Sequence, residues 1–162
     1  MKFCYECGCK LEIRKLEGEG EVPYCPGCKA FRFPIFNTAI STEVLNKDKN
    51  KILLIQQYGK RRYVLVAGYV NKGESAEETL VREVKEELGL CVLEQHFVKS
   101  EYFQPSNTLM LNFSCVVDSE NLNRINKEVD LATWFTVEEA KKNVFHDSLA
   151  ERFLLAYLKG QK

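Results

Sequence analysis

The chain has 162 residues, of which 45% are hydrophobic and 28% charged, a composition typical of a globular protein and not of a disordered or fibrous one. Its 23 basic and 23 acidic side chains give a formal net charge of +0, which argues against a partner held mainly by bulk electrostatics, such as long duplex DNA or an anionic membrane. No apolar stretch approaches the roughly 18 residues that span a bilayer, and the first residues lack the apolar core of a secretory signal. We therefore expect a cytoplasmic protein with no membrane partner, in which cysteines stay reduced.

The first segment, residues 1–34, carries two C-x-x-C pairs. Seventeen residues separate the two pairs, and this spacing is typical of a four-cysteine zinc site. Cys9 is a neighbour in sequence, but its spacing fits neither pair. We expect one structural zinc ion per chain, with a redox dithiol or an iron–sulfur centre as the alternatives. The expected ligands are Cys4, Cys7, Cys25 and Cys28.

From Ile35 onward, the apolar periodicity predicts alternating strands and helices. Strands are expected at 35–44, 51–57, 63–66, 92–98, 109–117 and 133–135. Helices are expected at 76–88, between Ser75 as N-cap and Gly89 as C-terminal stop, and at 148–159, with a short capped helix after residue 136. Mixed strands with helices packed on them predict an α+β fold, an α/β/α sandwich with a mixed sheet over residues 35–162, preceded by a zinc ribbon at 1–34. Cys91 and Cys115 are expected to be core thiols.

The helix expected at 76–88 gathers three carboxylates on one side. At about 100° per residue, Glu87 lies about 40° to one side of Glu83, and Glu86 lies about 60° to the other. The expected buried stripe, which begins beside Glu87, consists of Leu80, Val81, Val84 and Leu88. Carboxylates this close repel one another unless a cation neutralises them, and such hard oxygen ligands suit Mg²⁺ or Mn²⁺. Without further residues, however, this pattern is more often a solvated acidic face.

Further residues around the helix extend the pattern. Nine positions match the Nudix family's box, G-x5-E-x7-R-E-U-x-E-E-x-G-U, where U is a bulky aliphatic residue. They are Gly68, Glu74, Arg82, Glu83, Val84, Glu86, Glu87, Gly89 and Leu90. The chain therefore resembles a Nudix hydrolase. The resemblance implies a diphosphatase in which water attacks phosphorus and metal ions neutralise the developing charge, with Arg82, Glu83, Glu86 and Glu87 as catalytic residues.

A zinc ribbon directly before a Nudix domain resembles the NADH pyrophosphatase branch of that family, without the branch's N-terminal domain. The resemblance implies that Mg²⁺ or Mn²⁺ is held by the Ala67 carbonyl and by Glu83, Glu86, Glu87 and Glu128. It also implies substrate contacts through Phe33, Tyr69, Gln104 and Ala150, with the two aromatic rings stacking on a base, and it implies a homodimer. The branch's Trp-Pro-Phe-Pro sequence is absent between Gln104-Pro105 and Leu109-Met110.

The expected substrate is therefore an NAD(H)-like dinucleotide. ADP-ribose, a sugar nucleotide and NAD-capped RNA are the alternatives within the same chemistry. A different class of function is a non-catalytic module that binds a nucleotide or RNA. The complete set of box carboxylates argues against it, and the balanced charges around the cysteines give weak support to an RNA surface.

Overall fold

The structure is a computed structural model, which describes residues 2–160 of the chain. The chain divides into two compact units, Met1–Phe36 and Asn37–Lys162. No helix among the described residues is long and apolar enough to cross a membrane.

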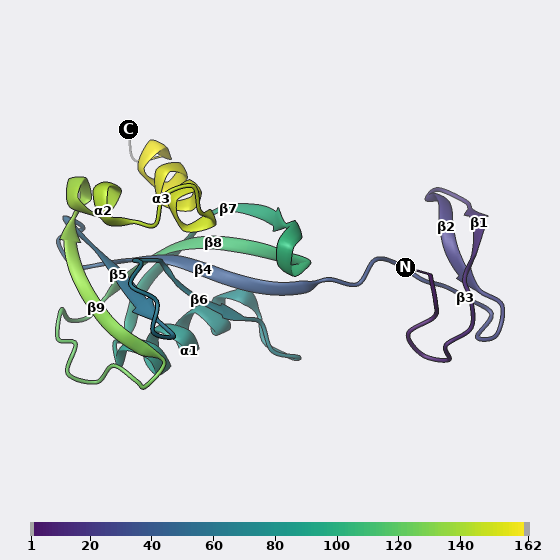
Figure 1. The fold of residues 1–162 in the computed structure, drawn as a ribbon, viewed down its shortest axis with the longest axis horizontal. Coiled ribbons are helices and arrows are strands. Elements are labelled where there is room, and N and C mark those ends of the chain that lie inside the picture. The colour runs from purple at the N-terminus through teal and green to yellow at the C-terminus, as the bar shows by residue number, and fades with distance from the viewer. Residues whose placement is uncertain (1, 161–162) are drawn as a thin grey trace. The chain divides into compact units, whose positions relative to one another are not determined.

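The N-terminal unit is a small antiparallel sheet of three strands. These are β1 (Glu12–Leu16), β2 (Gly20–Cys25) and β3 (Ala30–Phe31), in the order β1-β2-β3 (Figure 1). Among residues 2–36, only Cys4, Val22 and Cys25 are buried hydrophobic side chains. Such a core is too small to hold the unit together by apolar burial, so a further cross-link is needed.

The second unit is built on a mixed six-stranded sheet. Its strands are β4 (Asn37–Leu45), β5 (Lys51–Gln57), β6 (Val66–Tyr69), β7 (Val92–Phe103), β8 (Thr108–Val117) and β9 (Val129–Thr136). The strand order is β7-β8-β4-β5-β9, and β6 pairs with β4. The β4–β8 pair is parallel, while the other pairs are antiparallel.

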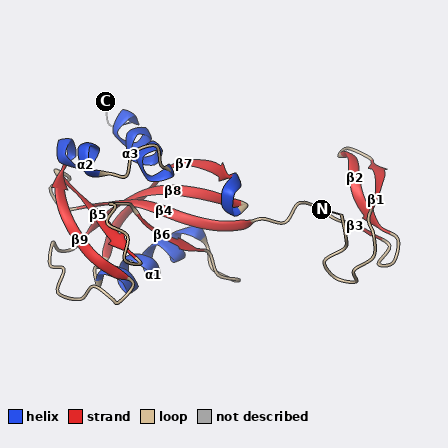
Figure 2. Ribbon diagram, in the orientation of Figure 1, coloured by secondary structure: helices blue, strands red, loops and turns tan. Residues whose placement is uncertain are grey.

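Helices cover both faces of this sheet. Helix α1 (Ala76–Leu88) lies on one face, and α2 (Val137–Asn143) and α3 (Leu149–Gly160) lie on the other (Figures 1 and 2). Alternate residues of β5 point to opposite faces: Leu53 and Ile55 join the core under α1, whereas Ile52 and Leu54 join the core under α2 and α3. The predicted α/β/α sandwich with a mixed sheet is confirmed.

Helix α1 begins and ends where the sequence predicts. The Ser75 hydroxyl accepts a hydrogen bond from the Glu78 amide, and the Glu78 carboxylate accepts one from the Ser75 amide, which completes a capping box. Gly89 ends the helix at φ 71°, a left-handed conformation that glycine adopts without steric cost. Both signals are local in sequence.

Several strands differ from the prediction in their bounds. Strand β4 begins at Asn37 and not at residue 35, and β9, expected at 133–135, spans Val129–Thr136. The strand expected at 63–66 lies at Val66–Tyr69 instead, because its ladder with β4 pairs Thr42 with Val66 and Ala39 with Tyr69. Tyr63 and Val64 make only isolated bridges. Strand β7 continues to Phe103, and register shifts in its pairing with β8 break the alternation that marks a strand in the sequence.

Two burial predictions are wrong. Val81 is exposed, because it lies at the far edge of the expected apolar stripe of α1, about 160° from Glu83. Cys91 is also exposed, since it precedes β7 in the connection from α1. Cys115, in the middle of β8, is buried as expected.

Candidate active site and zinc centre

Helix α1 and strand β6 approach so closely that Gly68 has no space for a side chain. A Cβ atom built on Gly68 would lie 2.0 Å from both Cδ and Oε1 of Glu83. The Glu83 carboxylate therefore rests directly on the backbone of β6, and its side chain is only 13% exposed. Any larger residue at position 68 would displace this carboxylate.

Arg82 ties the connection before α1, the helix and β6 together. Its guanidinium binds Glu74 through two hydrogen bonds, Nε to Oε1 at 2.7 Å and Nη2 to Oε2 at 3.0 Å. Nη1 contacts Glu83 Oε1 at 2.7 Å and Glu86 Oε2 at 3.1 Å, and Nη2 donates to the Tyr69 carbonyl at 3.1 Å. The Arg82 hydrogen bonds lower the pKa of Glu74 to about 2. Arg82 thus fixes the orientation of Glu83 by charge-assisted hydrogen bonds.

Glu87 is a buried carboxylate with one unsatisfied oxygen. The residue is 2% exposed. Gln57 Nε2 donates to its Oε1 at 2.9 Å, but Oε2 has no hydrogen-bond partner within the described part of the chain. Burial raises the pKa of Glu87 to about 7, and the charges of Glu83, Glu128 and Glu86 add to the effect. A buried, unpaired acceptor typically costs about 1–3 kcal/mol, a cost that a bound cation would offset.

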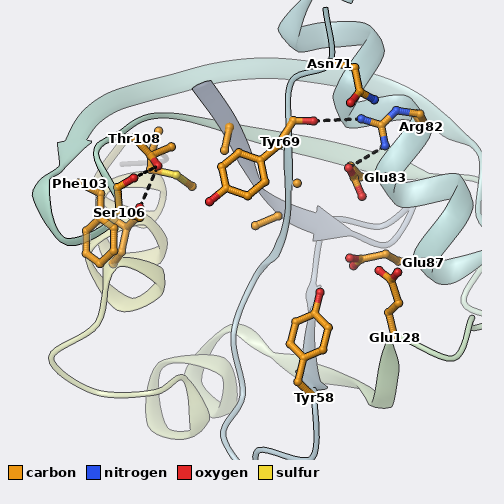
Figure 3. Close-up of a pocket in the computed structure, with 15 residues that line it drawn as sticks. Tyr58, Tyr69, Asn71, Arg82, Glu83, Glu87, Phe103, Ser106, Thr108 and Glu128 are labelled. Atoms are coloured by element: carbon orange, nitrogen blue, oxygen red, sulfur yellow. Dashed lines mark hydrogen bonds and ion pairs between the residues drawn. The ribbon is translucent and has the colours of Figure 1, made fainter. Parts of the chain in front are cut away.

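The carboxylates lie at one end of a cavity of about 470 Å³. Glu83, Glu87 and Glu128 point into this end, and Phe103, Ser106 and Thr108 lie at the opposite end, with Tyr69 between them (Figure 3). Ala39, Met110 and Leu149 add apolar surface to the wall. Small-molecule sites commonly have volumes of about 300–1,000 Å³, with an apolar wall and a few directed polar groups. A nucleotide-sized ligand therefore fits beside the carboxylates.

The N-terminal unit brings together the four cysteines of the two C-x-x-C pairs. All four Sγ atoms of Cys4, Cys7, Cys25 and Cys28 lie within 4.8 Å of one another, and none forms a disulfide. The Cys4–Cys28 and Cys7–Cys25 sulfur distances are 3.9 and 3.4 Å. Four sulfurs around zinc, each at about 2.3 Å, would stand about 3.8 Å apart. The quartet therefore fits a tetrahedral zinc ion.

Charge around the quartet also favours a cation. Burial opposes ionisation of Cys4, but hydrogen bonds outweigh it, chiefly that from Arg32 Nε at 3.2 Å, and lower its pKa to about 6. In contrast, the hydrogen bond with Cys7, together with burial, raises the pKa of Cys28 to about 12. Cys4 therefore ionises readily, whereas Cys28 keeps its proton. A bound metal ion would stabilise the thiolate form of all four cysteines. Cys9 stands outside the quartet.

Comparison with known proteins identifies the second unit. The NUDIX domain family matches residues 37–154. The chain belongs to the NUDIX family. This NUDIX chain is 26% identical over 157 residues to an NAD-capped RNA hydrolase NudC of Stutzerimonas stutzeri, covering 97% of this chain and 56% of that protein. It is 30% identical over 141 residues to the NudC of Vibrio parahaemolyticus, covering 86% of this chain and 52% of the relative.

Solved structures of the NUDIX fold resemble this one. A NUDIX hydrolase from Nitrosomonas europaea superposes with a TM-score of 0.67 at 18% identity, covering 99% of this chain and 94% of that chain. The NUDIX domain of Shewanella oneidensis NrtR, solved with ADP ribose, gives 0.66 at 12% identity, covering 86% and 94%. These likenesses show the fold. The NUDIX chain spans about half the length of the NudC relatives it matches.

The NUDIX cavity includes most of the residues that the sequence predicts for the site. Those on its lining are Ala67, Tyr69, Arg82, Glu83, Glu87 and Glu128. The lining does not include Glu86, Gln104 or Ala150, although their neighbours Phe103, Ser106 and Leu149 do line it. Glu86, whose side chain is 56% exposed, contacts Arg82 instead. Phe33 belongs to the N-terminal unit.

Several lining residues of the NUDIX cavity were missed from the sequence. They are Ala39, Tyr58, Asn71, Phe103, Ser106, Thr108, Met110 and Leu149. Asn71 lies inside the box motif, between Gly68 and Glu74, so its place in the motif could have identified it as a site residue. Ala39 and Met110 face each other in the parallel β4–β8 pair, a register that no local pattern reveals. Tyr58 lies in the connection between the strands expected at 51–57 and 63–66, where no motif singles it out.

Proposed function

We propose that this chain is a diphosphatase that hydrolyses the diphosphate bond of an NAD(H)-like dinucleotide in the cavity beside α1. One observation carries the proposal. Glu87 is a buried carboxylate with an unpaired oxygen, and it lies beside Glu83 and Glu128 at the end of a nucleotide-sized cavity. A cluster of this kind is stable when a cation neutralises it, and a metal-bound diphosphate is the matching ligand.

The residues present fit a divalent metal. Glu83, Glu87, Glu128 and the Ala67 carbonyl would hold Mg²⁺ or Mn²⁺, and Glu86 is a further predicted ligand. When bound, such an ion withdraws charge from the phosphoryl oxygens and lowers the pKa of a coordinated water. Members of this family need divalent metals.

The protein's own groups set the geometry of the reaction. Arg82 holds Glu83 in place at 2.7 Å, and Gln57 holds Glu87 at 2.9 Å, so both carboxylates are preorganised before substrate enters. Glu87, near the end of α1, is buried and shielded from bulk water. This low-dielectric setting strengthens the attraction between its carboxylate and a positive charge. The carboxylates would act through the cation that they hold, because positive charge fixed beside the phosphoryl oxygens is commonly the largest contribution to phosphoryl-transfer catalysis.

The dinucleotide preference rests on the similarity to NudC proteins, whose name describes them as NAD-capped RNA hydrolases. Tyr69 is 56% exposed on the cavity wall, where its ring is available to stack on a base. Such stacking is worth about 1–3 kcal/mol for nucleobases on aromatic side chains. Phe33 remains a predicted second stacking residue.

A substrate screen tests the function. NADH, NAD⁺, ADP-ribose, a sugar nucleotide and an NAD-capped RNA would each be incubated with Mg²⁺ or Mn²⁺, and the released phosphomonoester would be measured. We expect the dinucleotides to be cleaved fastest. Faster cleavage of one of the other compounds would reassign the substrate. Binding of nucleotides without cleavage of any compound, by protein with its metal bound, would mean that the domain is a non-catalytic module.

We further propose that Cys4, Cys7, Cys25 and Cys28 bind one structural zinc ion per chain, and that the protein works as a homodimer in the cytoplasm. The sulfur distances support the zinc ion. The free thiols suit a reducing compartment, and the dimer follows from the family resemblance. Light scattering on the purified protein would measure its mass in solution.

A further inference from the structure

The backbone after β5 adopts an uncommon conformation. Tyr58 has a φ of 56°, and the next residue, Gly59, has a φ of 69°. Glycine enters this left-handed region freely, but a side chain as large as tyrosine is rarely found there. Such a conformation persists where the surrounding structure enforces it, and it is frequent at functional sites.

Neighbouring groups enforce this conformation at both sides of Tyr58. Before it, the register of β5 against β9 shifts between Gln56 and Gln57. After it, the Gly59 amide donates a hydrogen bond to Asp130 Oδ2 at 2.6 Å, and the Lys60 amide donates to the Gln57 carbonyl at 3.1 Å. Strand β9 therefore holds the turn from one side through Asp130. A strand irregularity next to a site commonly re-aims a side chain, and here the side chain is that of Tyr58.

The redirected ring lines the cavity. Tyr58 is 69% exposed, yet it is one of the residues that form the cavity wall. Its hydroxyl points toward the end of the cavity where Glu87 and Glu128 lie (Figure 3). A tyrosine hydroxyl keeps its proton at neutral pH, because the phenol ordinarily ionises only near about pH 10, and it is therefore available as a hydrogen-bond donor.

This donor is not used within the protein. No hydrogen bond to the Tyr58 hydroxyl is present among residues 2–160, whereas the hydroxyl of nearby Tyr63 pairs with Thr133 at 3.2 Å. The main cation of the cavity, Arg82, is already bound to carboxylates and to the Tyr69 carbonyl. An anion entering the cavity would therefore meet few unengaged donors near the carboxylates.

We propose that Tyr58 binds the substrate's diphosphate by donating its hydroxyl proton in a hydrogen bond to a non-bridging phosphoryl oxygen, and that Asp130 is a positioning residue that holds Tyr58 in place through the Gly59 amide. The inference rests on the proposed function, because it assumes that a diphosphate occupies this cavity. It assigns substrate binding to a loop outside the box motif.

The test measures binding apart from turnover. Calorimetry in Mg²⁺ would compare ADP, which carries a diphosphate, with adenosine, which does not. Tyr58→Phe removes one hydroxyl and keeps the ring, so we expect ADP affinity to fall about 10-fold, as for a lost hydrogen bond to a charged group. Adenosine affinity should not change. In turnover assays the same variant should raise KM by a similar factor.

The Asp130 variants test the positioning role. Asp130→Ala removes the acceptor for the Gly59 amide and should weaken ADP binding in the same direction as Tyr58→Phe. Asp130→Asn retains an acceptor oxygen and should restore most of the affinity. In the double variant Tyr58→Phe/Asp130→Ala, the second change should add little, because both act through one contact. Tyr63→Phe is the matched control: it removes a neighbouring hydroxyl outside the cavity and should leave ADP affinity at the parental value.

The outcomes separate the inference from the proposed function. Unchanged ADP affinity and KM in Tyr58→Phe, in an active parent enzyme, would overturn the inference and leave the function standing. Conversely, a parent that binds ADP through Tyr58 but cleaves no diphosphate would overturn the function alone. A folded parent that neither binds ADP nor cleaves any diphosphate compound in Mg²⁺ would overturn both.

Discussion

Replacement of Glu87 by glutamine tests the centre of the proposed site. The change is nearly isosteric, and the new amide oxygen can still accept the hydrogen bond from Gln57 that Oε1 accepts now at 2.9 Å. It removes one negative charge from a residue that is 2% exposed and crowded by Glu83 and Glu128. The fold should therefore be retained, and the metal-free protein should melt at the parental temperature or above it, because a buried charge is lost.

Turnover should fall, although the melting temperature of the metal-free protein should not. Loss of one charge-stabilising group commonly lowers kcat by about 10²–10³-fold, which corresponds to about 2.7–4 kcal/mol in the barrier. The assay is kcat on the best substrate at saturating Mg²⁺, together with melting temperatures with and without the ion. The parent should be stabilised by Mg²⁺ and the variant much less, since a ligand stabilises the state that binds it.

Glu77→Gln is the matched control for this experiment. Glu77 lies in the first turn of the same helix, outside the cavity lining, and its replacement removes the same charge. It should leave kcat and the Mg²⁺ effect unchanged. Equal turnover of Glu87→Gln and the parent at saturating Mg²⁺ would refute the assignment of Glu87 to the metal.

Three further predictions follow from other parts of the molecule. Protein purified without added metal should contain about one zinc per chain by elemental analysis, and native Cys4 should resist alkylation until a chelator is added; zinc-free protein with reactive Cys4 would contradict this. Gly68→Ala should lower kcat by roughly 10²-fold through displacement of Glu83 by about 1 Å or more, which kinetics and a crystal structure can check. Glu43 is a fully buried residue of β4, and burial raises its folded-state pKa to about 8. The free energy of unfolding should therefore fall as pH rises from about 4.5 to about 8. Glu43→Gln should flatten this decline in urea titrations, and a parallel decline in both proteins would rule Glu43 out as its cause.

Features coded by neighbouring residues could be predicted from the sequence. The bounds of α1 follow from Ser75 and Gly89, which lie next to the helix in the chain. The order of exposure of its carboxylates also follows from the helical period, because Glu87 lies nearest the apolar stripe and Glu86 farthest from it. The structure has Glu87 at 2% and the Glu86 side chain at 56% exposed.

Features set by distant residues could not be predicted in this way. The bounds of β6 depend on its pairing with β4, so local periodicity placed the strand three residues too early. The cavity wall combines Tyr58, Phe103 and Leu149, which come from three separate segments of the chain. Tyr58 faces the cavity because of a backbone turn held by Asp130, and no sequence period encodes that turn.

The central position of β4 has a consequence for how the NUDIX unit folds. This strand pairs with β5, β6 and β8, and its partner residues in β8 lie roughly 70 positions later in the chain, a separation that slows folding because a long loop must close first. During synthesis the β4–β5 hairpin can form early, but one edge of β4 stays unpaired until β8 has emerged. Most side chains of β4 are buried in the finished sheet. Until β8 pairs with this edge, the nascent chain therefore exposes both apolar side chains and unpaired backbone groups, which favours self-association.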